Sequence, residues 1–250
     1  MRRNSSPYVG SVSFSPGPFS TALKVLIGVN VAVFILQQPQ LVPSLTTMFG
    51  LQPDLVLHEF RIWQLASYMF LHWGIFHILF NMLALWMFGA QLEQVWGTRF
   101  FLKFYFVAGI GSAILTVLFS LLPFGFARPL YHADIIGASG AIYGLLMAYA
   151  LYFPDRPILL IVFWVPAKWC VTILGAIALY SSLSDPGGVA NATHLGGLLV
   201  GYLYLKNGSL HPILEIRYRV NKWRLNRIRT RKKFDVYSGG RADDLNRRVH

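Results

Sequence analysis

Cysteine and acidic residues are scarce in this chain of 250 residues. It has one cysteine, Cys170, and ten Asp and Glu residues against 22 Lys and Arg. A single cysteine excludes a disulfide within the chain, and inside an apolar run it is expected to be a buried small hydrophobe. Only 13% of the residues are charged, whereas 55% are hydrophobic. This composition favours a protein whose helices lie in a lipid bilayer.

Six apolar runs approach the roughly 20 residues that a helix needs to cross about 30 Å of hydrocarbon. They cover residues 20–37, 74–92, 99–122, 139–153, 157–183 and 194–205. The fourth and sixth runs are short for a full crossing, so we expect their ends to lie below the membrane surface. Pro166 and Lys168 interrupt the fifth, so we expect its helix to begin near Ala167 and residues 158–165 to lie along the interface. The sequence thus predicts an all-α membrane protein with six transmembrane helices.

Positive charge predicts the orientation of these helices. Lys and Arg flank the first run, the second–third and fourth–fifth connections and the C-terminal tail, whereas the opposite connections hold only Arg61 and Arg128. By the positive-inside rule, both termini are expected in the cytoplasm. We predict a disordered cytoplasmic leader (residues 1–19), a six-helix domain (20–205) and a basic cytoplasmic tail (206–250).

The basic tail is expected to contact anionic lipid, because dense Lys and Arg next to a membrane span bind anionic headgroups. Nucleic acid is not an expected partner, because no aromatic stacking platform or recognition module accompanies the basic run. The net charge of +12 is therefore attributed to topology and lipid contact.

Three of the predicted helices begin on the outer side and carry polar residues near that end. His77 and Asn81 lie in the second helix, Ser139 opens the fourth, and His194 opens the sixth. Polar side chains inside a membrane are costly and usually face the bundle interior, so each is a candidate for function. Any one of them could instead be structural, as an interhelical hydrogen-bonding group or, for the serine, as a helix N-cap. Together they predict one polar site at a single depth.

Glycine spacing indicates how two of these helices meet. Each carries a GxxxG pattern just after its polar residue, at Gly140 and Gly144 and at Gly197 and Gly201. Such small-residue stripes let helix backbones approach closely in lipid, which would bring Ser139 and His194 within reach of each other. Tyr143 lies one turn after Ser139 on the same face, where it could stack on the imidazole or simply pack.

A serine and a histidine brought together in this way can hydrolyse a peptide bond. The His194 imidazole would remove the Ser139 proton and later protonate the leaving amine. Four aspartates lie in the connections between the helices: Asp54, Asp134, Asp155 and Asp185. None of them is placed to orient the histidine, so Ser139 and His194 would form a dyad and not a triad. Backbone N–H groups at the start of the fourth helix would hold the oxyanion, and His77 and Asn81, spaced i, i+4, could complete that hole.

Other chemistries find less support in the sequence. The H-E-x-x-H motif of a zinc enzyme is absent, and no pair of aspartates lies convincingly within the spans. His72, His77 and His194 lack carboxylate or thiolate partners for a metal, so neither a metal nor a cofactor is predicted. A channel or transporter would need polar groups in a path across the bilayer, whereas these cluster near one face.

Three blocks of the sequence together resemble the rhomboid family of intramembrane serine proteases. They are residues 70–83, Gly137 to Gly140 with Tyr143, and His194 to Gly197 with Gly201. The resemblance covers about residues 20–205, and it implies a Ser139/His194 dyad with His77 and Asn81 assisting the Ser139 amide in the oxyanion hole. It also implies His72 as a supporting residue nearby.

The resemblance further implies that the substrates are single-pass membrane proteins, cut at or near the outer end of the transmembrane segment. The first outer loop and the fifth helix would be the gates for such a substrate. Because water must reach the serine, we expect a hydrophilic cavity open to the outer side, around the polar residues named above. The six-span layout is similar to prokaryotic members and predicts a bacterial plasma membrane.

Two positions depart from the family pattern. Gln64 follows Trp63 where many members have arginine, which leaves open how the first outer loop is anchored. Thr193 precedes His194 where alanine is frequent. The family also contains members that bind membrane clients without cutting them, but these generally lose the serine or the histidine that this chain keeps.

Overall fold

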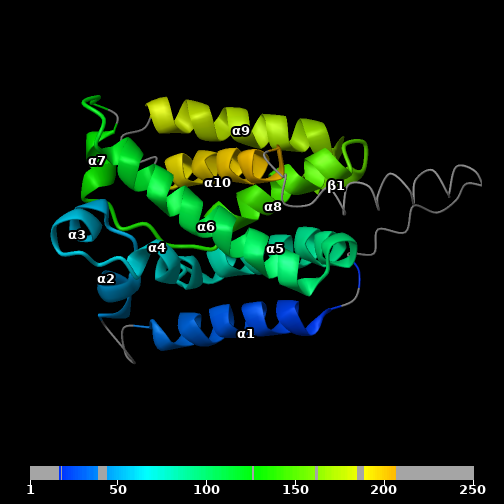
Figure 1. Ribbon diagram of the computed structural model, residues 1–250, viewed down its shortest axis with the longest axis horizontal. Coiled ribbons are helices and arrows are strands. Elements are labelled where there is room, and N and C mark those ends of the chain that lie inside the picture. The colour runs from blue at the N-terminus through cyan, green and yellow to red at the C-terminus, as the bar shows by residue number, and fades with distance from the viewer. Residues whose placement is uncertain are drawn as a thin grey trace, which may run out of the picture. The chain divides into compact units, whose positions relative to one another are not determined.

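The computed structural model describes residues 17, 19–38, 44–125, 127–160, 163–184 and 189–206. Apart from Gly17, Phe19 and Lys206, the predicted leader and basic tail lie outside the described residues. The described part is a bundle of helices with one short hairpin (Figure 1).

Six long helices make up the bundle within the described ranges. They are α1 (Thr21–Leu36), α5 (Ile75–Trp96), α6 (Thr98–Ser120), α8 (Ser139–Tyr152), α9 (Ala167–Ser184) and α10 (Val189–Lys206). The α1–α5 connection contains four short elements, α2 (Leu45–Phe49), α3 (Pro53–His58), α4 (Gln64–Ser67) and the 3-10 helix η1 (Tyr68–Phe70). The α6–α8 connection contains α7 (Arg128–Tyr131).

The long helices follow the apolar runs of the sequence closely. Three of them, α5, α6 and α9, are long and apolar enough to cross a membrane, and α1 and α8 are shorter apolar helices. The chain is therefore an integral membrane protein. Full crossing by α1, α8 and α10 and a cytoplasmic location of both termini stay predictions.

Two segments differ from the sequence prediction. Helix α10 begins at Val189, five residues before the predicted start, so His194 lies in its second turn. The run expected along the interface forms an antiparallel hairpin, β1 (Pro157–Leu160) with β2 (Phe163–Pro166), in which Pro157 faces Pro166. Two strands satisfy each other's backbone groups, and proline is tolerated at strand ends. The all-α prediction is therefore correct for the bundle and wrong for this hairpin.

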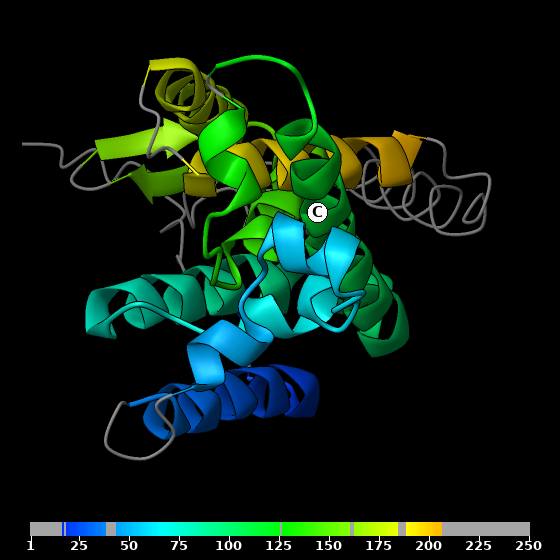
Figure 2. The same ribbon diagram turned by 90° about the vertical axis from the view of Figure 1, so that its left-hand side faces the viewer.

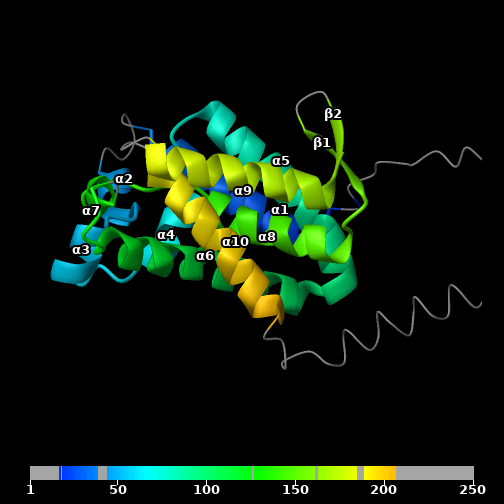
Figure 3. The ribbon, with the colours of Figure 1, turned by 90° about the horizontal axis from the view of Figure 1, so that it is seen from above.

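Helix α8 occupies the centre of the bundle. It packs against α5, α6, α9 and α10, whereas α1 lies at the edge beside α5 (Figures 1, 2 and 3). Most α8 residues are small or apolar and buried, including Gly140, Ala141, Gly144 and Leu145. Small residues let neighbouring backbones come close on several sides at once, which places α8 in the middle.

Neutral side chains anchor the first predicted outer loop. Gln64 is fully buried, and its amide accepts a hydrogen bond from Gln52 N at 3.1 Å and donates to Met48 O at 3.3 Å. The neighbouring Trp63 Nε1 also donates to Met48 O, at 3.0 Å. An amide that both accepts and donates thus fixes α2, α3 and α4 to one another without a charged side chain.

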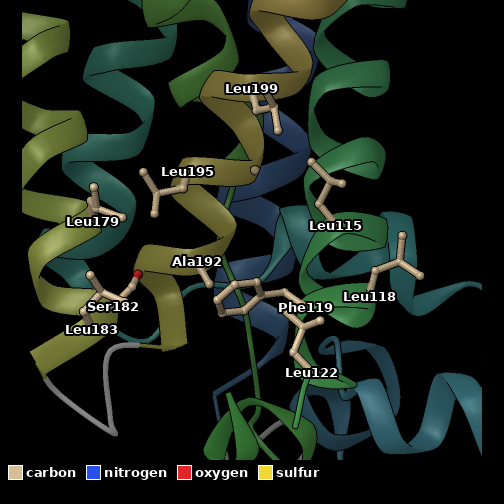
Figure 4. Close-up of a pocket in the computed structure, with 11 residues that line it drawn as sticks. Leu115, Leu118, Phe119, Leu122, Leu179, Ser182, Leu183, Ala192, Leu195 and Leu199 are labelled. Carbon is tan, nitrogen blue, oxygen red and sulfur yellow. The ribbon is translucent and has the colours of Figure 1, made fainter. Parts of the chain in front are cut away.

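An apolar pocket of about 450 Å³ lies between α6, α9 and α10 (Figure 4). Its walls are mainly leucine side chains, and Ser182 is the one hydroxyl-bearing residue among those that line it. Neither Ser139 nor His194 lines the pocket, so it is not the hydrophilic cavity that the sequence predicts. That cavity stays a prediction.

Candidate active site

Ser139 and His194 lie side by side near the first turns of α8 and α10. Ser139 is the first residue of α8, and the His194 Nε2 atom lies 2.8 Å from its Oγ atom, a hydrogen-bond distance. The N-cap position belongs to Ala138 and no side chain caps the helix, so Ser139 does not serve as an N-cap. The structural alternative considered for this serine therefore has no support in the geometry.

Glycines bring the two helices into backbone contact. A Cβ on Gly197 would overlap the carbonyl oxygen of Gly140, and one on Gly201 would lie 2.9 Å from the Cα of Gly144. These four glycines are the two GxxxG patterns of the sequence. Any larger residue would separate α8 from α10 and with them the serine from the histidine.

Tyr143 and Thr193 hold the imidazole of His194 and its helix. The Tyr143 and His194 rings are parallel to within 3°, with centroids 4.2 Å apart, so the tyrosine fixes the plane of the imidazole. Thr193 is buried, and its Oγ1 lies 3.0 Å from Oγ1 of Thr116 on α6. This hydrogen bond ties α10 to α6 directly beside the histidine.

No acidic side chain contacts His194 among the described residues. Its Nδ1 atom is buried and has no hydrogen-bond partner there. Asp54 lies in the first turn of α3, a departure from the predicted loop, and its carboxylate pairs with His58 and His132 at 3.0 Å each. Asp134 accepts a hydrogen bond from Gln52, Asp155 pairs with Lys168, and Asp185 lies outside the described residues. Among the residues that the structure describes, the geometry is therefore that of a pair and not of a triad.

The segment before Ser139 adopts a conformation that requires glycine. Gly137 has φ +129°, and its N–H donates to the carbonyl oxygen of Tyr68 at 2.9 Å. A Cβ there would lie 2.9 Å from Cε1 and Nε2 of His77, so only glycine leaves room for that ring. The His77 ring therefore lies directly beside the segment that leads into Ser139.

The tautomer of His77 follows from its other contact. Its Nδ1 atom accepts a hydrogen bond from the Trp73 N–H at 3.3 Å. In a neutral imidazole one nitrogen accepts and the other donates, so Nε2 carries the hydrogen. Nε2 is also the nitrogen beside Gly137, which leaves an N–H donor next to the start of α8.

Asn81 lies one turn further along α5 and is buried. Its Nδ2 atom donates to the carbonyl oxygen of His77 at 2.8 Å, within the same helix. An amide nitrogen has a second hydrogen, which this bond leaves available. No hydrogen bond between Asn81 and Ser139 is present in the described structure, so its place in an oxyanion hole stays a prediction.

His72 is fully buried just before α5. Its ring packs edge-on against His77, with centroids 5.0 Å apart, and neither ring nitrogen makes a hydrogen bond of ordinary geometry among the described residues, although the Phe70 backbone lies near enough to act on the ring. Burial, with a smaller contribution from His77, lowers the pKa of His72 to about 4, so the ring is neutral at pH 7. His72 thus supports His77 by packing.

Several polar residues around the site were missed by sequence reasoning. Gln37, at the C-terminal end of α1, bonds both backbone groups of His72. The Tyr68 hydroxyl donates to Gly109 O at 2.8 Å and lies 2.9 Å from Ser112 Oγ, which joins η1 to α6. No motif signals these residues, because each acts on a partner more than 30 residues away in the chain. Within the described ranges, no group of three His, Cys, Asp or Glu residues could hold a metal ion.

The site is a serine–histidine pair near the closely packed ends of two helices in an apolar bundle, which defines a membrane protein with a half-buried polar centre. A family model described as the rhomboid domain matches residues 59–208. The chain belongs to the rhomboid family.

Curated relatives from three kingdoms of life are similar to this chain. It is 38% identical over 72% of its length to the mitochondrial rhomboid protein 1 of Saccharomyces cerevisiae, of which the match covers 51%. It is 33% identical over 80% of its length to RHOMBOID-like protein 2 of Arabidopsis thaliana, covering 59% of that protein. It is 27% identical over 78% of its length to the rhomboid protease GlpG of Pectobacterium atrosepticum, covering 64% of it.

The chain thus spans about half to two thirds of the length of these three relatives. Their sources include a mitochondrial protein of yeast and a plant protein as well as a bacterial protease. This range of sources does not support the predicted bacterial plasma membrane over other membranes. The comparisons and the apolar helices show an integral membrane protein, without naming the membrane.

Proposed function

We propose that this protein is an intramembrane serine endopeptidase that uses a Ser139/His194 dyad. The observation that carries the proposal is the 2.8 Å contact between Ser139 Oγ and His194 Nε2, inside a bundle of apolar helices. Membership of a family that includes named proteases supports it.

The mechanism follows from the donors and acceptors at the site. His194 Nε2 accepts the Ser139 proton as Oγ attacks the scissile carbonyl carbon. The resulting imidazolium then gives this proton to the leaving amine, and an acyl-enzyme ester remains. Water, deprotonated by the same imidazole, hydrolyses the ester, which restores the serine hydroxyl and releases the new carboxyl terminus. Stacking on Tyr143 keeps the imidazole in one orientation throughout.

The oxyanion of each tetrahedral intermediate would lie beside the start of α8. The Ser139 N–H, the favourable end of the α8 dipole and the His77 Nε2–H are the donors that this geometry offers, and Asn81 could add its free amide hydrogen. Gly137 leaves the space in which the His77 ring lies. In this proposal the donors are arranged before the substrate arrives.

The substrates that we propose are single-pass membrane proteins, cut near one end of the transmembrane segment. A site among helices receives a substrate helix from the lipid side, and the first loop with α9 would form the gate. The basic tail would bind anionic lipid headgroups. A protein that binds such clients without cutting them is the rival function, and the intact serine–histidine pair argues against it.

The decisive experiment compares purified wild type with Ser139→Ala and His194→Ala on a tagged single-pass substrate in liposomes. We expect both variants to lose at least about 10³-fold in kcat/KM, as for other serine–histidine pairs. Ser182→Ala and His132→Ala are matched controls outside the site and should cut at the wild-type rate.

A fluorophosphonate probe gives a second readout that needs no substrate. It should label wild type at Ser139, detected by peptide mass, and leave Ser139→Ala unlabelled. Wild type that neither labels nor cuts several test helices, while remaining folded and binding them, would favour the client-binding function.

A further inference from the structure

Gln37 makes an unusual pair of hydrogen bonds across the bundle. The His72 N–H donates to its Oε1 atom at 2.9 Å, and its Nε2 atom donates to the carbonyl oxygen of the same residue. One side-chain amide thus satisfies both backbone groups of one residue 35 positions away. Such two-point pairing fixes position and orientation together, because rotation about one bond would break the other.

The neighbouring Gln38 provides an internal comparison. Its Nε2 atom donates to Phe34 O, at 2.9 Å, one turn back in its own helix. A glutamine at a helix end can satisfy itself locally, as Gln38 does. Gln37 instead reaches the backbone of another element, which makes its contact specific to the tertiary structure.

From His72 the contact continues to the site. The His72 ring packs edge-on against His77, and the His77 ring lies beside Gly137 and the start of α8. Neither His72 ring nitrogen makes a hydrogen bond of ordinary geometry among the described residues, and the contact of the ring with the Phe70 backbone stays within its own segment. No hydrogen bond of the ring to another element therefore fixes where it lies. The backbone clamp from α1 therefore sets the position of His72 against His77.

We propose that Gln37 is a positioning residue for the oxyanion side of the site, acting through His72 on His77. The inference rests on the proposed function. A donor that stabilises charge formed only in the transition state changes kcat more than KM. Loss of the Gln37 clamp should therefore lower kcat and leave KM nearly unchanged.

Gln37→Glu tests this proposal with a pH signature. A protonated glutamic acid has nearly the shape of glutamine and can accept from His72 N–H while its O–H donates to His72 O. The ionised form has only acceptors, which places a negative oxygen against that carbonyl. The clamp should therefore be broken at high pH and restored as the pH falls through the pKa of the new carboxyl group.

The measurement is kcat of each variant divided by kcat of wild type at the same pH, from pH 5 to 8. The variants share every other titratable group with wild type, so the ratio removes the effects that are common to both. We expect the Gln37→Glu ratio to be about 0.1 at pH 8, a smaller loss than the roughly 10²–10³-fold for removing an oxyanion donor itself, because the His77 donor is displaced but still present. The ratio should rise several-fold at pH 5. The matched control Gln38→Glu, one residue along, should keep a ratio near one throughout.

Gln37→Met covers the case in which the charged variant does not fold. It lacks both hydrogen bonds at every pH, so its kcat ratio should be low and independent of pH, with KM unchanged. A Gln37→Glu ratio that does not change with pH, or a Gln37→Met enzyme with wild-type kcat, would overturn the positioning role. An inactive wild type would instead overturn the proposed function, so the two failures are distinct.

Discussion

The contact between α8 and α10 differs from the contact that α9 makes with the bundle. Between α8 and α10, paired glycines leave no room for a Cβ, so the two backbones touch. On α9, a Cβ at Gly175 would meet only the end of the Leu198 side chain, at 3.3 Å. Half of the apolar window of α6 is buried, but only 28% of that of α9.

This difference shows where the bundle is rigid and where it is loose. Lipid chains are as apolar as leucine, so helices in a membrane associate through close packing and hydrogen bonds rather than through hydrophobic burial. The helices that carry Ser139 and His194 have such packing, whereas α9 presents large side chains outward, among them Ile177, Tyr180 and Leu183. A loosely held α9 is compatible with the proposed gate.

Gly197→Ala should disrupt the contact between α8 and α10 and have the largest effect on stability and activity. The added methyl group would overlap the Gly140 backbone, which cannot move like a flexible side chain. We expect a loss of at least about 3 kcal/mol in the free energy of unfolding, the upper end for overpacking, and loss of proteolysis. Denaturant titration in detergent micelles and the cleavage assay would measure both.

The control for this glycine is Gly28→Ala on α1. A Cβ at Gly28 meets no atom within 4 Å, and alanine favours helix by up to about 1 kcal/mol. Stability equal to or above wild type is expected there. Equal effects of the two substitutions would show that the α8–α10 contact is not specially tight.

Leucine truncation sharpens the same comparison with an intermediate effect. Leu145 on α8 is fully buried, and Leu183 on α9 is 54% exposed. Leu145→Ala should cost about 1–2 kcal/mol, less than the roughly 2–5 of water-soluble cores, because the separated helix stays in an apolar solvent. Leu183→Ala should cost under about 0.5 kcal/mol, since lipid replaces the lost contacts. Unfolding in micelles measures the pair, and a larger cost at Leu183 would contradict the loose attachment of α9.

Thr193→Val tests the hydrogen bond between α10 and α6, which we expect to make the smallest contribution to the stability of the tightly packed helices. It removes the hydroxyl that bonds Thr116, while Thr116 keeps its bond to Ser112 O at 2.8 Å. Interhelical hydrogen bonds in membranes average about 0.6 kcal/mol, which is the expected coupling in a double-mutant cycle with Thr116→Val. Zero coupling would mean that backbone contact alone holds α10 to α6.

Sequence reasoning placed the helices and the central pair because both depend on local patterns. Apolar runs predicted α1, α5, α6, α8 and α9 to within a few residues, and the glycine spacing predicted that Ser139 and His194 come within reach. Sequence reasoning was wrong where a contact with another segment determines the local structure. Residues 157–160 and 163–166 form two strands because each pairs with the other, and α10 begins at Val189 although its apolar run starts later.

By itself, the sequence determined that the protein lies in a membrane, which helices carry the polar residues, and which helices can touch. Only the tertiary structure decided that the Gln64 amide anchors the first loop, that Gln37 clamps His72, and that Thr116 bonds Thr193. The physical reason lies in the range of the forces. Hydrophobic residues and small glycines recur along a helix, so they form a periodic pattern that can be seen in the sequence. A single hydrogen bond between distant residues produces no such pattern.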